Sequence, residues 1–336
     1  MESSSTPAKS LPKVLIVGGG FGGLSAAKQL AGKGVNVTLI DRTNHHLFQP
    51  LLYQIATAGL SPADIAQPIR HILRDANNIE VVLGEVDWID CDSKQVRTTD
   101  NVAYAYDYLI LAAGARHSYF GHDEWEELAP GLKSLEDAIE LRRRILRAFE
   151  AAEMADSEED RKAALTFAIL GAGPTGVEMA GAIAELAHKT LSADFRRIDL
   201  RSTRILLLDG APRVLQSFPE ELSRSALAQL KSMGVEVHTG TIVKDVSSRG
   251  VTVNNEFVPS RTVVWAAGNS AAPIAKSFGA ETDRAGRIIV NEDLSVPGHT
   301  EIFAIGDMAC FKHQTGRLPG SAPALCTQAS KLAQLL

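Results

Sequence analysis

A glycine-rich loop near the start of the chain has the residue types and spacing that bind a dinucleotide. The apolar run Lys13–Val17 leads into Gly18-Gly19-Gly20-Phe21-Gly22-Gly23, and a run compatible with a helix follows from Leu24 to Leu30. A second apolar run, from Val35 to Ile40, ends at Asp41. This order of strand, turn, helix, strand and acid is typical of a unit that binds a pyrophosphate and a ribose.

Three glycines of this loop are explained by turn geometry, ligand approach and packing. Gly18 permits the tight turn, Gly20 lets the backbone approach a pyrophosphate, and Gly23 lets helix and strand pack closely. The helix N-terminus offers unpaired N–H groups to the phosphates, and Asp41 can accept hydrogen bonds from a ribose. The alternative is a glycine-rich turn with a purely structural role.

The same pattern returns in the second half of the chain. The apolar run Leu165–Leu170 leads into Gly171-Ala172-Gly173-Pro174-Thr175-Gly176, and a helix is expected from Val177 to Leu186. The next strand ends at Asp209, after an excursion that we place at Lys189–Ser202. Two such units predict two dinucleotides, or one dinucleotide and one flavin, in two similar domains. A tandem duplication that binds only once is the alternative.

Other expected strands end in small or acidic residues. Tyr106–Leu111 ends at Ala112-Ala113-Gly114, Thr262–Trp265 ends at Ala266-Ala267-Gly268, and Thr300–Ile305 ends at Gly306-Asp307. Ligands of α/β sheets lie beyond the carboxyl ends of the strands. Asp307 can therefore reach a ribityl hydroxyl group of a flavin.

Bulk composition predicts a globular protein and no nucleic-acid partner. The 336 residues are 45% hydrophobic and 22% charged, with a net charge of −6, which favours about two domains of ordinary size. There is no basic patch interleaved with aromatics. The sequence contains no run of 18 apolar residues, so no transmembrane helix is expected. The first residues have no apolar core of a secretory signal, and we expect a disordered tail over residues 1–11.

Cysteine and histidine usage gives no reason to expect a metal. Cys91, Cys310 and Cys326 are scattered and form no C-x-x-C pair, which fits a reducing compartment and argues against disulfides or a zinc site. The adjacent pair His45-His46 has no accompanying ligand cluster.

Taken together, these motifs resemble the flavoproteins with two dinucleotide-binding domains, and most closely the type II (alternative, non-proton-pumping) NADH:quinone oxidoreductases. The resemblance runs over nearly the whole chain from about Lys13, and its most specific segment is Asn44–Gln54. It also rests on both glycine loops, on Leu60-Ser61-Pro62 and on Ala304-Ile305-Gly306-Asp307.

The resemblance implies an α/β fold of two Rossmann-like domains. We expect FAD to be bound by residues 12–120 and 281–336, a discontinuous domain that is incomplete at its C-terminal end. We expect NADH to be bound by the inserted residues 121–280. The family continues for several dozen residues into amphipathic helices that lie on the membrane, so the chain is either a fragment or a natural short form without this anchor.

The resemblance also implies roles for individual residues. Glu178 matches a family glutamate beside the nicotinamide and is the candidate catalytic residue; its alternative role is an acid that complements a helix dipole. Asp209 would accept from the ribose 2′-OH and repel a 2′-phosphate, which favours NADH over NADPH. The expected FAD-binding residues are Gly18, Gly20, Phe21, Gly22, Gly23, Asp41, Arg42, Gln49, Val86, Ala113, Gly114 and Asp307. The expected NADH-binding residues are Gly171, Gly173, Thr175, Gly176, Glu178, Asp209 and Gly268.

The expected activity is hydride transfer from NADH to FAD, followed by transfer of two electrons to a quinone without proton pumping. The expected quinone-site residues are Gln49, Thr327 and Gln328, although Thr327 stands where the family motif has a Gln. The alternatives are a related flavin reductase with another acceptor, or a truncated nucleotide-binding redox protein without catalysis. We expect a cytoplasmic protein, placed at the cytoplasmic face of the membrane in a full-length form and touching it peripherally there. A homodimer is a possible assembly.

Overall fold

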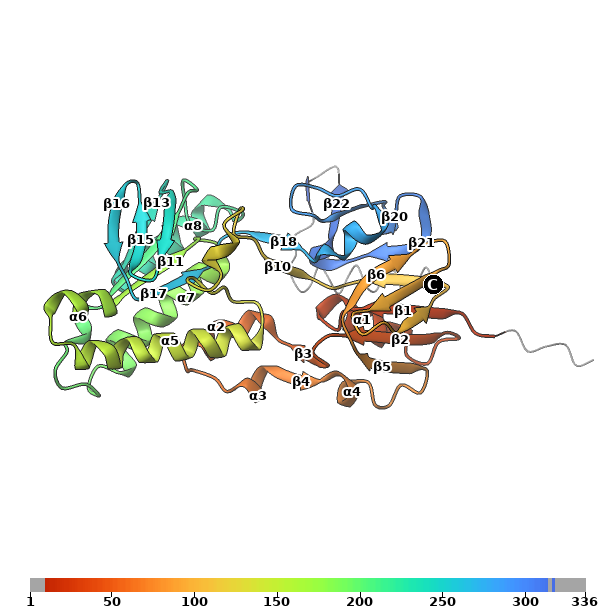
Figure 1. Ribbon diagram of the computed structural model, residues 1–336, viewed down its shortest axis with the longest axis horizontal. Coiled ribbons are helices and arrows are strands. Elements are labelled where there is room, and N and C mark those ends of the chain that lie inside the picture. The colour runs from red at the N-terminus through yellow and green to blue at the C-terminus, as the bar shows by residue number, and fades with distance from the viewer. Residues whose placement is uncertain (1–9, 314–315, 318–336) are drawn as a thin grey trace, which may run out of the picture. The chain divides into compact units, whose positions relative to one another are not determined.

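A computed structural model describes residues 10–313 and 316–317, which divide into two compact units. The first unit takes the described residues up to Leu47, Ala66–Arg116, and the described residues from Ser270 on. The second unit takes Phe48–Ile65 and His117–Asn269. Each unit is built on a parallel sheet with helices (Figure 1), so the expected α/β class with Rossmann-like cores is confirmed.

The division lies near the boundaries expected from the sequence but does not coincide with them. The sequence places the changes of domain at residues 120 and 280, whereas the units part after Arg116 and Asn269. Residues 48–65 group with the second unit, although the sequence-based division assigns them to the FAD-binding domain.

The first unit is organised around a sheet of order β20-β21-β9-β1-β2-β5. Strand β1 pairs in parallel with β2 on one side and with β9 on the other. Residues Val14–Ile16 of β1 are almost completely buried, because helices and loops cover both faces of a central parallel strand. The elements of this sheet and its helix are β1 (Lys13–Val17), α1 (Phe21–Leu30), β2 (Asn36–Asp41), β5 (Ile79–Leu83), β9 (Tyr108–Leu111), β20 (Ser295–Val296) and β21 (His299–Ala304).

Smaller elements complete the first unit. They are β3 (His45–Leu47), β4 (Ala66–Pro68), α4 (Ile69–Ile72), β6 (Val86–Asp90), β7 (Gln95–Thr98), β8 (Ala103–Ala105), η5 (Pro273–Phe278), β19 (Ile288–Val290), η6 (Gly306–Met308), β22 (Ala309–His313) and β23 (Gly316–Arg317). Strands β10 (Ala115–His117) and β18 (Asn269–Ala271), where the chain changes unit, form a two-stranded sheet.

The segment after Leu60 differs from what its sequence predicts. Ser61 or Asp64 could cap a helix that runs through Ile69 and Ile72, but only α3 (Pro62–Ile65) and the short α4 are helical. Between them, β4 pairs antiparallel with β3. Pro68 ends β4, and a proline inside a helix would remove a hydrogen-bond donor and clash with the preceding turn.

The second unit has a parallel sheet of order β13-β12-β11-β17. One face packs against helices, as the contact of Phe149 in α5 with Phe167 in β11 illustrates, and a small antiparallel sheet, β14-β15-β16, covers the other. The strands are β11 (Thr166–Leu170), β12 (Arg204–Asp209), β13 (Val235–Thr239), β14 (Val243–Ser247), β15 (Gly250–Val253), β16 (Glu256–Pro259) and β17 (Thr262–Trp265). The helices are η1 (Gln49–Leu51), α2 (Leu52–Ala56), α3, η2 (Asp123–Trp125), α5 (Leu135–Met154), α6 (Glu158–Ala164), α7 (Pro174–Glu185), η3 (Leu186–Thr190), η4 (Leu200–Ser202) and α8 (Glu220–Ser232).

Local signals explain where the helices of this unit begin. The sequence Ser134-Leu135-Glu136-Asp137 predicts a capping box. The structure confirms it, because the Ser134 side chain accepts from Asp137 N while the Asp137 carboxylate accepts from Ser134 N. Pro174 occupies the first turn of α7, where its missing N–H costs nothing. The polar and acidic stretch Met154–Asp160 predicts a linker. The connection is shorter than that, because Ser157 caps α6 from Glu158 onward.

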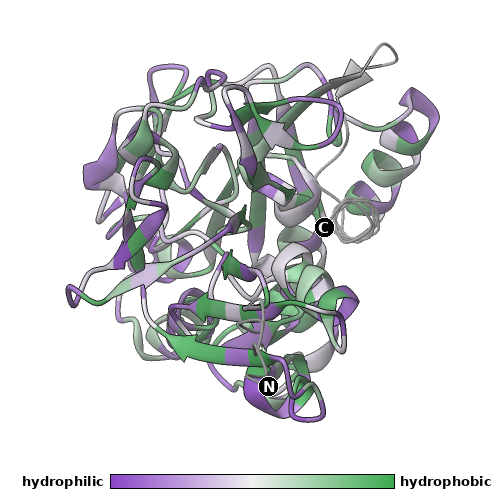
Figure 2. Cartoon of the chain, turned by 90° about the vertical axis from the view of Figure 1, so that its right-hand side faces the viewer, coloured by the Kyte–Doolittle hydropathy of each residue, from purple (hydrophilic) through white to green (hydrophobic). Residues whose placement is uncertain are grey.

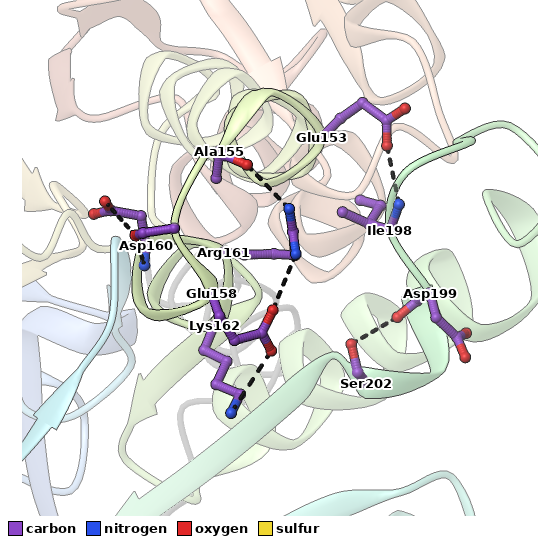
Figure 3. A network of polar contacts seen from close by, with 10 residues as sticks. Glu153, Ala155, Glu158, Asp160, Arg161, Lys162, Ile198, Asp199 and Ser202 are labelled. Atoms are coloured by element: carbon purple, nitrogen blue, oxygen red, sulfur yellow. Dashed lines mark hydrogen bonds and ion pairs between the residues drawn. The ribbon is translucent and has the colours of Figure 1, made fainter.

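The excursion between α7 and β12 is tied to the end of α5 by one carboxylate. Glu153 accepts hydrogen bonds from the backbone N–H groups of Arg196, Arg197 and Ile198, and Figure 3 shows the contact with Ile198. In the same region, Arg161 donates to Glu158 and to Ala155 O. The Glu153 bonds therefore hold the long connection at the end of α5, and the Arg161 bonds fix the turn from α5 into α6.

Hydrophobic residues run along the strands, and hydrophilic residues gather in many of the loops (Figure 2).

Across residues 10–313 and 316–317, no helix is long and apolar enough to cross a membrane.

Candidate functional site

The first glycine loop joins β1 to α1 in a geometry that only small residues permit. Gly18 has φ +101°, and an added Cβ there would lie 2.4 Å from Ala112 O. An added Cβ at Gly23 would lie 1.8 Å from Gly18 O. At Gly20, in contrast, no described atom lies within 4 Å of an added Cβ. Gly18 and Gly23 are therefore required by packing, whereas the space beside Gly20 is open to a ligand.

Asp41, at the end of β2, binds the loop directly. Its Oδ2 accepts from Gly19 N at 2.7 Å, and its Oδ1 accepts from Thr43 N at 2.8 Å and from Asn44 N at 3.0 Å. Oδ1 also accepts from Thr43 Oγ1 at 2.8 Å, so it is fully used. Oδ2 accepts the single bond from Gly19 N among the described residues, and its second lone pair can receive a ribose hydroxyl group. Asp41 thus holds the loop in place and can still accept from a ligand.

A cavity of about 360 Å³ opens at this end of the first sheet. Five of the expected FAD-binding residues line it: Gly18, Asp41, Arg42, Val86 and Ala113. The other expected residues do not line this cavity. Gly20 precedes α1, and Phe21, Gly22 and Gly23 lie within α1. Gly114 follows β9, Asp307 lies in η6, and Gln49 lies in η1 of the second unit.

Two arginines share one carboxylate on the wall of this cavity. Arg116 Nη2 lies 2.8 Å from Glu85 Oε1, and Arg42 Nη1 lies 4.0 Å from the same oxygen. Asp41 and Asp87 also line the cavity, so the positive charge is local to the two arginines, and a phosphate group would have to lie beside them. The sequence reasoning missed Glu85 and Arg116. Glu85 follows the C-terminal end of β5, so the rule on strand ends could have found it.

The second glycine loop repeats the first in detail. Gly171 has φ +109°, with an added Cβ 2.6 Å from Ala266 O, and an added Cβ at Gly176 would lie 1.8 Å from Gly171 O. Gly173 matches Gly20, since no described atom lies within 4 Å of its added Cβ. Gly171 N donates to Leu208 O at 2.7 Å, as Gly18 N donates to Ile40 O at 2.8 Å. The internal repeat expected from the sequence is therefore also a repeat in backbone geometry.

Asp209 has the position in the second unit that Asp41 has in the first. It ends β12 and accepts hydrogen bonds from Ala172 N and from Ala211 N, the latter at 2.6 Å. The loop and its acid are again joined before any ligand binds.

A larger cavity, of about 670 Å³, lies at the C-terminal edge of the second sheet. Five of the expected NADH-binding residues line it: Gly171, Gly173, Thr175, Asp209 and Gly268. Gly176 and Glu178 lie in α7 and outside the lining. The sequence reasoning missed a set of aromatic, basic and aliphatic side chains on the walls: His117, Phe120, His122, Trp125, Lys133, Ile242 and Trp265.

His117 is held on this wall by a carboxylate. Its Nε2 lies 3.3 Å from Asp137 Oδ2. Burial opposes ionisation of Asp137, but hydrogen bonds from His117 and from the N–H groups of Lys133 and Ser134 outweigh it and hold the pKa of Asp137 below its usual value. The imidazole orientation is therefore fixed by the same carboxylate that caps α5.

Glu178 lies in the first turns of α7, and the residue is exposed. Protein atoms around the carboxyl group nevertheless displace part of its water and raise its pKa above the usual value, because removal from water disfavours the charged form. A raised carboxyl pKa is common among groups that handle protons or polarise a substrate.

The remaining expectations concern the quinone site, the histidine pair and a metal site. Thr327 and Gln328 fall outside the residues that the structure describes. His46 Nδ1 lies 3.1 Å from Gly19 O, and the His46 ring meets Phe21 edge-on at 5.1 Å, so its surroundings are those of the first loop. In the described part of the chain, no group of three or more His, Cys, Asp or Glu residues could hold a metal ion.

Comparison with known proteins places this chain in a family. A model of the pyridine nucleotide-disulphide oxidoreductases matches residues 12–333. Two relatives from Mycobacterium tuberculosis are the type II NADH:quinone oxidoreductases Ndh, 47% identical over 92% of this chain and 69% of its own length, and NdhA, 48% identical over 88% and 66%. The chain thus spans about two thirds of the length of these relatives. The NDH2 of Plasmodium falciparum in complex with NADH shares the fold, with a TM-score of 0.87 at 20% identity over 96% of this chain and 82% of that one.

Proposed function

The chain belongs to the pyridine nucleotide-disulphide oxidoreductase family and, within it, to the type II NADH:quinone oxidoreductases, and we propose that it oxidises NADH through a bound FAD and reduces a quinone without pumping protons. The observation that carries this proposal is the duplicated loop. Two glycine loops with matching backbone contacts each end at a cavity, and each is tied to an acid. Such a pair supports one flavin and one nicotinamide nucleotide.

We assign FAD to the first unit. Gly20 leaves the backbone open to a pyrophosphate, Asp41 accepts from the adenosine ribose, and Arg42 supplies positive charge beside the 360 Å³ cavity. Asp307 follows β21 at the same edge of the sheet and would accept from the ribityl chain. When bound, FAD supplies the two-electron chemistry that connects a hydride donor to a quinone.

We assign NADH to the second unit. The open space beside Gly173 receives the pyrophosphate at the N-terminus of α7, where the helix dipole favours negative charge. Asp209 accepts from the ribose 2′-OH and repels a 2′-phosphate, which selects NADH over NADPH. Glu178, in the first turns of α7 after the second glycine loop, is the proposed catalytic residue, because it matches the family glutamate placed beside the nicotinamide.

The quinone site is proposed from the family resemblance, at Gln49 in η1 and at Thr327 and Gln328. We further propose that the protein lies at the cytoplasmic face of the membrane, that it touches the membrane peripherally, and that it forms a homodimer.

The test is a chemical and a kinetic measurement on the purified protein. The cofactor released by heat is identified by mass, and NADH oxidation is followed with and without a water-soluble quinone. We expect FAD in about equal amount to protein and NADH oxidation that depends on the quinone. Release of FMN, or oxidation that a disulfide or ferredoxin acceptor supports and a quinone does not, would contradict the proposal.

A further inference from the structure

Phe120 is an exposed aromatic residue on the wall of the 670 Å³ cavity. It is 69% exposed, and its backbone has φ +56°. A bulky residue in the left-handed region is a genuine outlier, and such conformations gather at ligand sites, where the surrounding structure enforces them. Both the exposure and the backbone conformation indicate that Phe120 has a role beyond packing.

The surrounding contacts hold Phe120 in this place. Ser118 N donates to Gly268 O at 3.3 Å, and Trp265 Nε1 donates to Ser118 O at 3.1 Å. The rings of Phe120 and Trp265 have centroids 5.9 Å apart and are inclined by 59°. The segment that carries Phe120 is therefore fixed to the end of β17, and the Trp265 ring contacts the Phe120 ring.

Gly268 makes room for the Phe120 ring. An added Cβ at Gly268 would lie 2.6 Å from Phe120 Cζ and 2.6 Å from Ser118 O. Gly268 also has φ +74°, a conformation that glycine adopts without strain. Its small size therefore allows the ring to lie on the backbone at the cavity edge.

The order of the sheet tells which half of a dinucleotide Phe120 faces. Asp209 ends β12, and Ile242 lies in the connection after β13, on the outer side of β12. Trp265 ends β17, on the opposite side of β11, whose glycine loop takes the pyrophosphate. A dinucleotide with its adenosine ribose at Asp209 crosses the loop and brings its other half to the end of β17.

We propose that Phe120, backed by Trp265, is the surface on which the nicotinamide half of NADH packs. This inference rests on the proposed function, because it requires NADH in the second unit. The exposed ring face is covered when the planar nicotinamide lies against it, in an offset or inclined arrangement that aromatic pairs favour. Phe120 is thus a positioning residue that fixes the nicotinamide, while Ile242, 64% exposed on the same cavity, covers the adenosine half.

Two ligands separate these roles in the flavin-loaded protein. NAD⁺ carries both halves, whereas ADP-ribose lacks the nicotinamide. We expect Phe120→Ala to weaken NAD⁺ binding about three- to tenfold, the range given by an aromatic pair, with ADP-ribose binding unchanged. Phe120→Tyr keeps the ring and the backbone conformation and should restore NAD⁺ binding. Ile242→Ala is the matched control and should weaken both ligands alike.

Calorimetry gives the dissociation constants, and thermal unfolding shows whether each variant is folded. Phe120→Leu, which keeps apolar bulk without a ring, serves as the second variant if Phe120→Ala is unstable, and it should lose NAD⁺ affinity in the same selective way. Equal weakening of NAD⁺ and ADP-ribose by the Phe120 variants, or no weakening of either, would overturn the inference while leaving NADH binding intact. A wild-type protein that binds neither ligand would overturn the proposed function as well.

Discussion

The backbone N–H of Gly19 donates a 2.7 Å hydrogen bond to Asp41 Oδ2, so the acid at the end of β2 holds the glycine loop that follows β1. Ala172 and Asp209 repeat this relationship in the second unit. Each acid therefore holds its glycine loop by a hydrogen bond, in addition to the ribose contact that we propose. A substitution that tests ligand selection must preserve an acceptor for the loop.

Asp209→Asn should shift nucleotide preference toward NADPH. The amide keeps one oxygen, which can accept from Ala172 N of the loop, and loses the acceptor for Ala211 N. It also removes the negative charge that repels a 2′-phosphate. We expect the ratio of kcat/KM for NADH to that for NADPH to fall about tenfold, equal to about 1.4 kcal/mol. Asp199→Asn, an exposed acid in the excursion, is the control. An unchanged ratio in Asp209→Asn would show that this acid does not select the nucleotide.

Gly23→Ala should lower the stability of the protein, whereas Gly20→Ala should lower its flavin content. At Gly23 the new methyl group would meet Gly18 O at 1.8 Å, so we expect a loss of stability of about 1–3 kcal/mol by overpacking. At Gly20 the methyl group enters open space, and we expect the apoprotein to unfold within a few degrees of wild type while FAD content falls severalfold. Absorbance gives the flavin content, and denaturant unfolding gives the stability. Normal flavin loading in Gly20→Ala would exclude this loop as the pyrophosphate site.

Glu178→Gln should separate catalysis from folding. Because the folded-state pKa of Glu178 is raised, its contribution to stability is complete below the ordinary glutamate pKa of about 4.3 and is lost as pH rises through the folded pKa. The neutral amide avoids this loss, so at pH 8 the variant should be at least as stable as wild type. Flavin reduction by NADH, followed by stopped flow, should nevertheless slow about tenfold or more. If the variant instead loses flavin or stability, Glu178 has a structural role.

Asp137→Asn should weaken the start of α5 in a pH-dependent way. The lowered pKa of Asp137 means that its contribution to stability is complete above the ordinary aspartate pKa of about 3.9 and is lost as pH falls through the lower folded pKa. Loss of the cap should cost about 1 kcal/mol at pH 7, and the difference from wild type should shrink below about pH 4. Urea unfolding at both pH values measures it. A constant difference would assign the effect to packing.

The repeated strand, turn and helix could be predicted because each depends on local sequence. Buried parallel strands need continuous apolar runs, and Gly18 and Gly171 stand where the backbone adopts positive φ. The rest depends on contacts between distant segments. Glu85, in the turn between β5 and β6, and Arg116, in β10, are 31 residues apart in sequence and meet only in the folded chain. Strand β4 replaces an expected helix because it pairs with β3. The left-handed backbone conformation of Phe120 could not be predicted either, because a bulky residue such as phenylalanine seldom adopts positive φ.

The central claim is that this chain carries electrons from NADH to a quinone through a flavin, and a single anaerobic titration tests it most directly. The visible spectrum of the purified protein is recorded alone, after one equivalent of NADH, and after a soluble quinone. We predict a flavin spectrum that NADH bleaches and the quinone restores. A flavin spectrum that NADH leaves unchanged, or one that NADH bleaches and no quinone restores, would contradict the account.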